Sequence, residues 1–254
     1  MGMPALSFAG VTKEFLLPAG KLKVRALDRF SFEVPAGEVL ALLGPNGSGK
    51  STAIKLALGL LQPSQGQVRV EGKPAELPEV RRHVGFVPDV GGVPLHLSGR
   101  EALEWWGKMN DLGRDEQSQR IRDVLKQVNL DEPADRRVSE YSRGMKKRLA
   151  LAQAILPRPR LLLLDEPFAG LDPMAIDRQI GLLTRLRGEG CTLLFSSHLL
   201  SRIEGLADRV VLIHRGKNIA AGPAEDVLGR PLQRERGWDD VYRERIMQAE
   251  AEAS

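Results

Sequence analysis

Runs of apolar residues, some alternating and some continuous, predict a series of β-strands along the chain. Phe30–Val34 alternates between apolar and polar residues, which is typical of a strand with one buried face. Val39–Leu43 and Leu161–Leu164 are continuous apolar runs of strand length, as expected for strands that are buried on both faces. Further strands are predicted at Gln67–Val70, Cys191–Phe195 and Val210–Ile213.

Helical patterns fill the stretches between these strands. One helix is predicted from Lys50 to a point before Pro63, and two more at about Gly144–Ile155 and Met174–Arg187. Because helices alternate with strands, we expect an α/β fold with a mostly parallel sheet whose two faces are covered by helices.

The segment from about residue 90 to residue 144 has a different texture, which predicts a helical insert in the α/β core. Glu101–Trp106 and Ile121–Val128 are amphipathic at helical spacing. Trp105 and Trp106 are interpreted as packing residues of this insert rather than as a ligand site.

The chain ends in a charged tail that starts at about residue 229. Trp238, Val241, Tyr242 and Ile246 fall on one face of a helix in this tail. We therefore expect one large domain over residues 1–228, followed by a partly helical tail over residues 229–254.

Composition is ordinary for a globular protein, with 42% hydrophobic and 28% charged residues in a chain of 254. The formal net charge of +4 comes from 37 basic residues interleaved with 33 acidic ones, and no basic run stands apart from acids. We therefore expect a solvated surface and no nucleic acid partner.

The single cysteine, Cys191, allows no disulfide within the chain, and its apolar surroundings predict a small buried residue. This usage fits a reducing, cytoplasmic setting. The first residues lack the pattern of a signal peptide, and no run of about 18 apolar residues occurs. We therefore do not expect the chain to span a membrane by itself.

Gly44–Ser51 matches the pattern G-x-x-x-x-G-K-[ST] and lies between a buried strand and a helix. Glycines let backbone N–H groups turn toward an anion, and the following helix directs its positive end to the same place. Lys50 adds a charge for the β- and γ-phosphates, and Ser51 offers a hydroxyl to Mg²⁺. The residues predicted to hold the nucleotide are Gly44, Pro45, Asn46, Gly47, Ser48, Gly49, Lys50, Ser51 and Thr52.

Two carboxylates, Asp165 and Glu166, follow the apolar strand Leu161–Leu164. Buried acids are costly unless a partner satisfies them, and Mg²⁺ and a water beside a phosphate cradle are suitable partners. Asp165 is therefore predicted to contact the metal shell, and Glu166 to polarise the attacking water as general base.

At this point the chain resembles the nucleotide-binding domains of ABC transporters. Tyr141–Lys146 is similar to the signature of that family, usually Leu-Ser-Gly-Gly-Gln, with Ser142 and Gly144 matching and the positions around them departing. Ala169–Asp172 looks like the D-loop of the family, and Leu193–His198 looks like its switch strand.

The resemblance runs from about Leu6 to Ala221 and implies roles for single residues. Ser142 and Gly144 are expected at a helix N-terminus that contacts nucleotide. His198 is expected to contact the γ-phosphate as a catalytic residue. Phe15 is expected to stack on adenine, and its alternative role is that of a core residue.

The same resemblance implies a fold and a set of partners. The fold is a P-loop NTPase core with a mostly parallel sheet, an N-terminal antiparallel β subdomain and an inserted α-helical subdomain, within an ABC ATPase domain over residues 1–228. The cofactors are ATP and Mg²⁺. The expected assembly is a homodimer with two ATP molecules at its interface, which drives a separate transmembrane permease from the inner face of the cell membrane. The helical insert around residues 89–112 is the expected docking surface.

One position departs from the family. Val84–Asp89 resembles the segment that ends in the Q-loop glutamine, and here the last residue is Asp89. Asp89 is a candidate metal ligand, but it is one methylene shorter than Glu, so its contact to Mg²⁺ or water is expected to need a solvent molecule. An acid at this position and the run Leu97–Glu101 resemble the ABC-2-type exporter branch, which favours export.

Two other functions fit part of the pattern. A soluble ABC-type ATPase acting in DNA repair or translation typically carries tandem domains, long coiled coils or zinc motifs, whereas this chain has one cassette and one cysteine. A regulator that binds nucleotide without hydrolysing it would not need Lys50, Asp165, Glu166 and His198 together.

Overall fold

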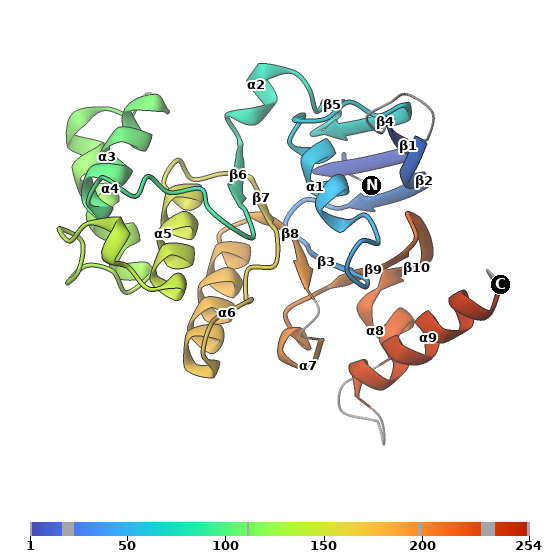
Figure 1. The fold of residues 1–254 in the computed structure, drawn as a ribbon. Helices are drawn as coiled ribbons and strands as arrows, with labels where there is room; N and C mark the ends of the chain where they lie inside the picture. The colour runs from blue at the N-terminus through green and yellow to red at the C-terminus, as the bar shows by residue number, and fades with distance from the viewer. Residues whose placement is uncertain (1, 17–22, 111, 198–199, 230–236, 253–254) are drawn as a thin grey trace.

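The computed structural model describes residues 2–16, 23–110, 112–197, 200–229 and 237–252. Its fold is α/β, with one antiparallel sheet and one mostly parallel sheet (Figure 1). The strands are β1 (Leu6–Leu16), β2 (Lys23–Val34), β3 (Val39–Leu43), β4 (Gln65–Val70), β5 (Lys73–Pro74), β6 (Val84–Val87), β7 (Leu161–Leu164), β8 (Thr192–Ser197), β9 (Arg209–His214) and β10 (Lys217–Pro223).

Several helices lie around these sheets, and two others, α3 and α4, lie together on one side of the molecule (Figure 1). The helices are α1 (Lys50–Ala57), α2 (Pro78–Arg81), α3 (Gly99–Met109), α4 (Arg114–Gln127), a 3₁₀ helix (Val138–Glu140), α5 (Arg143–Ile155), α6 (Pro173–Gly188), α7 (Leu200–Ile203), α8 (Ala224–Leu228) and α9 (Trp238–Glu252). None of the helices in the described part of the chain is both long enough and apolar enough to cross a membrane.

The larger sheet has the strand order β10-β9-β3-β8-β7-β6. Its strands from β9 to β6 are parallel to their neighbours, and only β10 pairs antiparallel, with β9. The carboxyl ends of β3, β6, β7 and β8 therefore meet at one edge of the sheet, which is where loops of α/β proteins form binding sites. The predicted mostly parallel sheet is confirmed.

The smaller sheet has the order β2-β1-β4-β5, and all its pairs are antiparallel. It confirms the expected N-terminal antiparallel subdomain. Phe8, Phe30 and Phe32 pack together on this sheet, with ring centroids 4.6–5.9 Å apart; Phe8 and Phe32 are stacked, and the other two pairs meet edge to face.

Burial on both faces of the larger sheet follows from its continuous apolar strands. In β3, Ala41 and Leu43 face one hydrophobic core, while Leu40 and Leu42 face another. The second core joins α1 and the smaller sheet to the larger sheet, and the first joins the sheet to α5, α6 and the helical insert. Alternation of side chains along a strand explains this division, because neighbouring residues point to opposite faces.

The helical insert consists of α3 and α4, which pack on each other and on α5. The interpretation of Trp105 as a packing residue is wrong, since its side chain is 51% exposed. Trp106 does pack partly against the core. The two residues are neighbours on a helix, so they point in directions about 100° apart and cannot both face the core.

The tail contains the helix α9, which packs on α7 and α8. Its first residue, Trp238, is 2% exposed and belongs to the core on that face of the sheet, and Val241 and Tyr242 pack partly against the same core. The expected helical face of the tail is therefore present, while the division of the chain at residue 228 stays a prediction.

Candidate functional site

The loops that follow β3, β6 and β7 enclose a cavity of about 230 Å³ at the carboxyl edge of the larger sheet. It is lined by Ala26, Asn46, Gly47, Gly49, Lys50, Ser51, Thr52, Asp89, Asp165 and Glu166. Segments that lie more than a hundred residues apart in the sequence thus meet here, and they are those from which the nucleotide and metal roles were predicted.

Glycines shape the loop between β3 and α1. Gly49 has φ of 116°, and a Cβ atom on it would lie 2.7 Å from the carbonyl oxygen of Ala26. A Cβ atom on Gly44 would lie 2.2 Å from the carbonyl oxygen of Ile213 in β9. Both positions therefore require glycine, one for its backbone angle and its close packing and the other for its close packing.

The N-terminus of α1 opens into the cavity without a side-chain cap. Its first N–H groups are therefore free to donate to a ligand, and the helix dipole adds positive potential. Ser48 is 3% exposed, and its Oγ has no hydrogen-bond partner among the described residues. A buried hydroxyl without a partner is unusual, so this loop fits an anionic ligand better than it fits an empty turn.

Lys50 is buried beneath this loop. Its Nζ donates to the carbonyl oxygens of Gly44 at 2.7 Å and Pro45 at 3.2 Å, and lies 3.8 Å from Oε1 of Glu166. Burial lowers the pKa of Lys50, and the charges of Glu166 and Asp165 act in the opposite direction. These contacts hold the lysine side chain at the cavity wall.

Ser196, in β8, joins the two carboxylate residues. Its Oγ donates to Oδ1 of Asp165 at 2.7 Å and accepts from the backbone N–H of Glu166 at 2.8 Å. Sequence reasoning missed Ser196, although a polar residue at the end of an apolar run was a signal for it. The hydrogen bond from Ser196 engages one of the two carboxylate oxygens of Asp165, a residue that is 8% exposed.

The backbone of Glu166 adopts a left-handed conformation, with φ of 46°. This conformation costs a residue with a side chain about 1–2 kcal/mol, so other contacts must maintain it. Two such contacts are present: Ser196 accepts from its N–H, and Lys147 of α5 donates to its carbonyl oxygen. With this backbone conformation, Glu166 lines the cavity. Strained backbone conformations of this kind are common in functional sites.

Lys147 is the second residue that sequence reasoning missed. Its side chain is 4% exposed, and its Nζ also lies 3.3 Å from Oδ1 of Asp89. Burial lowers the pKa of Lys147, while the charge of Asp89 raises it. The signal for this lysine was its spacing of four from Leu151, which places a charged residue on the buried face of a helix.

Asp89 lines the cavity next to Asp165 because β6 pairs with β7, and the backbone N–H of Asp165 donates to Val87 at 2.8 Å. One of its carboxylate oxygens is committed to Lys147. Its predicted role as a metal ligand therefore stays a prediction, with one oxygen left to serve it.

Four predicted site residues lie away from this cavity or outside the described residues. Ser142 caps α5 by accepting from the backbone N–H of Met145 at 3.2 Å, as expected for a helix N-cap, and Gly144 lies in the same first turn. Phe15 is 36% exposed on β1, with the ammonium of Lys13 5.1 Å from its ring centroid. His198 lies outside the described residues.

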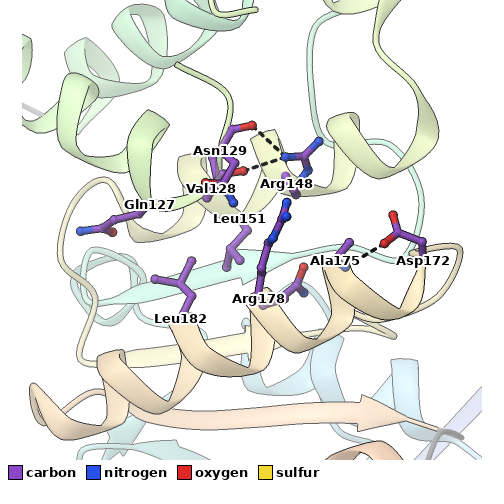
Figure 2. Close-up of a pocket in the computed structure, with 10 residues that line it drawn as sticks. Gln127, Val128, Asn129, Arg148, Leu151, Asp172, Ala175, Arg178 and Leu182 are labelled. Atoms are coloured by element: carbon purple, nitrogen blue, oxygen red, sulfur yellow. Dashed lines mark hydrogen bonds between the residues drawn. The ribbon is translucent and has the colours of Figure 1, made fainter. Parts of the chain in front are cut away.

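A smaller cavity of about 80 Å³ lies between α4, α5 and α6, where the helical insert meets the core (Figure 2). Arg148 of α5 donates to the carbonyl oxygens of Val128 and Asn129 at 3.1 and 2.8 Å and so ends α4. Burial and the nearby guanidinium of Arg178 lower the pKa of Arg148. This cavity contains none of the predicted site residues, and we interpret it as part of the joint between insert and core.

Comparison with known proteins gives the same family for most of the chain. The model of the family described as ABC transporter matches residues 27–169. The Nod factor export ATP-binding protein I of Rhizobium johnstonii is 36% identical over 241 residues, which are 92% of this chain and 76% of that protein. The linearmycin resistance ATP-binding protein LnrL of Bacillus subtilis is 35% identical over 202 residues, which are 79% of this chain and 65% of that protein.

The chain spans 62% and 59% of the length of two other curated relatives, ABC transporter ATP-binding proteins of Nostoc and Synechocystis. Among solved structures, an ATP-binding subunit of an ABC transporter superposes with a TM-score of 0.84 at 29% identity, over 95% of this chain and 99% of the other.

Two further solved structures are similar to this chain. One is cbiO1 of Clostridium perfringens, part of the transporter complex cbiONQ, with a TM-score of 0.76 at 28% identity over 88% of this chain and 90% of the other. The other is a dimeric ATP-binding cassette with ADP and Pi, with a TM-score of 0.79 at 25% identity over 86% of this chain and 98% of the other. With the family model matching more than half of its residues and a phosphate loop, a carboxylate pair and a capped signature helix in place, this chain belongs to the ABC transporter family of ATP-binding proteins.

Proposed function

We propose that this chain binds ATP and Mg²⁺ and hydrolyses ATP to power a separate transmembrane permease, in the direction of export. The observation that carries the proposal is the meeting of Lys50, Asp165 and Glu166 in one cavity beneath an uncapped helix N-terminus. A glycine-rich turn without a ligand is not expected beside a buried lysine and two acids, because burying each charged group costs free energy.

The residues around the cavity suggest how hydrolysis proceeds. Backbone N–H groups of the loop and of α1, with Lys50, hold and orient the phosphates and stabilise the charge that grows on them in the transition state. Glu166 accepts a proton from the water that attacks the terminal phosphorus, and its backbone is already held by Ser196 and Lys147. Inorganic phosphate and ADP are the products.

The oxygen groups in the cavity also fit Mg²⁺, which prefers hydroxyl, carboxylate and phosphate oxygens. The hydroxyl of Ser51 and the carboxylate of Asp165 would hold the ion, and Asp89 would reach it through solvent. When bound, Mg²⁺ neutralises phosphate charge during transfer. We also propose that His198 contacts the γ-phosphate and that Phe15 stacks on the adenine.

The assembly we propose is a homodimer in which the signature residues Ser142 and Gly144 of one chain face the phosphate loop of the other. Support comes from the dimeric cassette among the similar structures and from Ser142, whose helix N-terminus is exposed and ready to meet an anion. Attachment to a permease would put the chain on the inner face of the cell membrane. Support comes from the similar protein cbiO1, which is part of a transporter complex.

An apolar surface on the helical insert supports docking to a permease. Val90, Leu95, Trp105 and Met109 are all more than half exposed, and they lie in or just before α3. Contiguous patches of exposed apolar residues often mark protein–protein or membrane interaction sites. Export is favoured by the relatives, whose names refer to Nod factor export and linearmycin resistance.

The test of this function is the substitution Glu166→Gln, which keeps the shape of the side chain and removes the base. Steady-state ATP turnover should fall by about 10²–10⁴-fold, the usual contribution of a general base. Affinity for ATP, measured by calorimetry, should stay within about threefold of wild type. With ATP bound and not hydrolysed, the variant should accumulate as a dimer in size-exclusion chromatography.

A matched control is Glu189→Gln, an exposed acid at the end of α6 far from the cavity in sequence and in the fold. This variant should turn over ATP at the wild-type rate. Full turnover by Glu166→Gln would show that another group is the base, and absence of ATP binding by the wild-type chain would overturn the proposed function as a whole.

A further inference from the structure

A third cavity is lined by residues of the turn that joins β9 to β10 and of the C-terminal helix α9. Figure 1 shows where these two elements lie in the fold. Its volume is about 690 Å³. It is lined by His214, Arg215, Lys217, Asn218, Ile219, Arg245, Gln248 and Ala249. None of these residues lines the nucleotide cavity, so the two cavities are separate sites.

The lining of this cavity is strongly basic. It includes three cationic side chains and one histidine, and no acid. Arg215 and Arg245 are exposed and form no ion pair with any described residue, while Lys217 lies 3.5 Å from Asp28. Cations of like charge repel each other unless an anion or solvent separates them, so this arrangement favours an anionic ligand.

His214 gives a second, independent indication of a ligand. It is the last residue of β9, it is 8% exposed, and neither of its ring nitrogens has a hydrogen-bond partner among the described residues. At least one ring nitrogen always carries a proton, and a buried donor without a partner costs about 1–3 kcal/mol. A ligand that accepts a hydrogen bond from this imidazole would remove that cost.

We propose that this cavity binds a phosphate-bearing anion, with His214 as a donor at its floor and Arg215 and Arg245 closing on it from the turn and from α9. Guanidinium groups match phosphate oxygens with paired hydrogen bonds, which makes arginine the better residue for this task than lysine. The ligand joins two elements that are distant in sequence, so binding holds α9 against the hairpin.

The cavity is connected to the nucleotide site through the backbone. Gly216, in the turn, donates its N–H to the carbonyl oxygen of Ser48 in the phosphate loop at 2.8 Å. Gly216 has φ of 77°, and a Cβ atom on it would lie 2.6 Å from the carbonyl oxygen of Ala26, so the turn fits closely here. A ligand on Arg215 therefore acts one residue away from a contact with the phosphate loop.

The shared chemistry, a phosphate group, could come from a free phosphate compound or from a lipid headgroup, and two arms of one experiment distinguish them. In the first arm, pyrophosphate is titrated by calorimetry into the full chain saturated with ADP, so that the phosphate loop is filled. In the second arm, vesicles of phosphatidylglycerol or of phosphatidylcholine are sedimented with the chain.

The variants are Arg245→Ala and Arg215→Ala, and the matched control is Arg243→Ala, an exposed arginine of α9 that does not line this cavity. We expect binding in at least one arm, weakened about tenfold or more in both lining variants and unchanged in the control. Binding of pyrophosphate assigns a free ligand, and binding only of phosphatidylglycerol vesicles assigns a headgroup.

A direct readout that does not depend on the variants is the ¹⁵N signal of the His214 imidazole, which should shift when the probe binds. Circular dichroism of each variant checks that it is folded. The proposal is overturned if neither probe binds, or if binding is the same in the lining variants and the control. These results do not depend on hydrolysis, so they separate this site from the proposed ATPase function.

Discussion

At the scale of single residues, the nucleotide site contains two buried lysines with different positions. Lys50 lines the cavity and lies near Glu166. Lys147 contacts both the carboxylate of Asp89 and the backbone carbonyl oxygen of Glu166. Burial lowers the pKa of both lysines, and nearby carboxylates oppose this effect. We therefore expect Lys50 to bind phosphate and Lys147 to position the neighbouring acids.

Substitution of Lys147 by alanine tests this positioning role. The change leaves the carbonyl oxygen of Glu166 without its donor and Asp89 without its cation, so the free energy of unfolding in urea should fall by about 2 kcal/mol. Turnover of ATP should fall as well, because the left-handed backbone of Glu166 loses one of its two supports.

Lys146→Ala is the matched control, since Lys146 is the neighbouring residue and makes no side-chain hydrogen bond or ion pair with any described residue. It should leave the free energy of unfolding near wild type. Equal losses of stability in the two variants would contradict the role of Lys147.

At the scale of elements, polar residues cap one helix of the insert and two helices of the core. Ser98, Ser142 and Asp172 each accept a hydrogen bond from the backbone N–H three residues later, at the first turns of α3, α5 and α6. At α3 the cap is reciprocal, because Glu101 also accepts from the backbone N–H of Ser98 at 2.8 Å. In contrast, α1 has no side-chain cap, and its N-terminus faces the phosphate cavity.

Substitution of Ser98 by alanine should lower the free energy of unfolding by about 1 kcal/mol, the usual value of an N-cap. Urea unfolding followed by circular dichroism measures it. Ser139→Ala, an exposed serine whose hydroxyl has no hydrogen bond with a described residue, should change the same quantity little. A loss as large in Ser139→Ala would show that the cap at α3 contributes nothing special.

The carboxylate half of the same cap predicts a pH dependence. The hydrogen bond from the backbone of Ser98 lowers the pKa of Glu101 below its ordinary value of 4.5. Because the folded pKa is the lower one, the stabilisation is present above pH 4.5 and is lost as the pH falls through the folded value.

The stability difference between wild type and Glu101→Gln should therefore be seen at neutral pH and should narrow below pH 4.5. Glu104→Gln, an exposed acid on the same helix, is the control and should show no such trend. A difference that stays constant from pH 7 to pH 3 would contradict the assignment.

On the scale of the whole molecule, the C-terminal helix is attached to the core at its first residue. Trp238 is buried, and its indole N–H donates to the carbonyl oxygen of Gly229 at 3.4 Å. The remainder of α9 extends over the basic cavity, where Arg245 is exposed. The attachment of α9 therefore determines whether the basic cavity exists.

Replacement of Trp238 by alanine should release α9, because truncating a buried tryptophan costs about 3–5 kcal/mol. Hydrogen exchange of the α9 amides should become faster, while exchange in β3 and β7 stays slow, since the helix is a peripheral unit. Met247→Ala, at a residue of α9 that is 69% exposed, should leave exchange as in wild type. Unchanged protection of α9 in Trp238→Ala would show that other contacts hold it.

Local patterns in the amino-acid sequence were sufficient to predict six strands, the phosphate loop and the N-cap at Ser142. Continuous apolar runs identified the strands buried on both faces, and the residues from Gly44 to Ser51 identified the loop, because a turn between strand and helix depends on neighbours in the chain. Ser142 was recognised as an N-cap for the same reason, and the position of α1 after the loop followed from it.

Contacts between distant segments required the three-dimensional arrangement. The bonds of Ser196 and Lys147 to the catalytic segment, the exposure of Trp105 and the unpartnered imidazole of His214 all depend on which strands and helices become neighbours. Strand order and helix packing arise from burial of the whole chain, and sequence spacing carries no direct information about them. The residue types of the nucleotide site could thus be predicted from local sequence. Its supporting contacts and the separate basic cavity depend on the fold that brings these segments together.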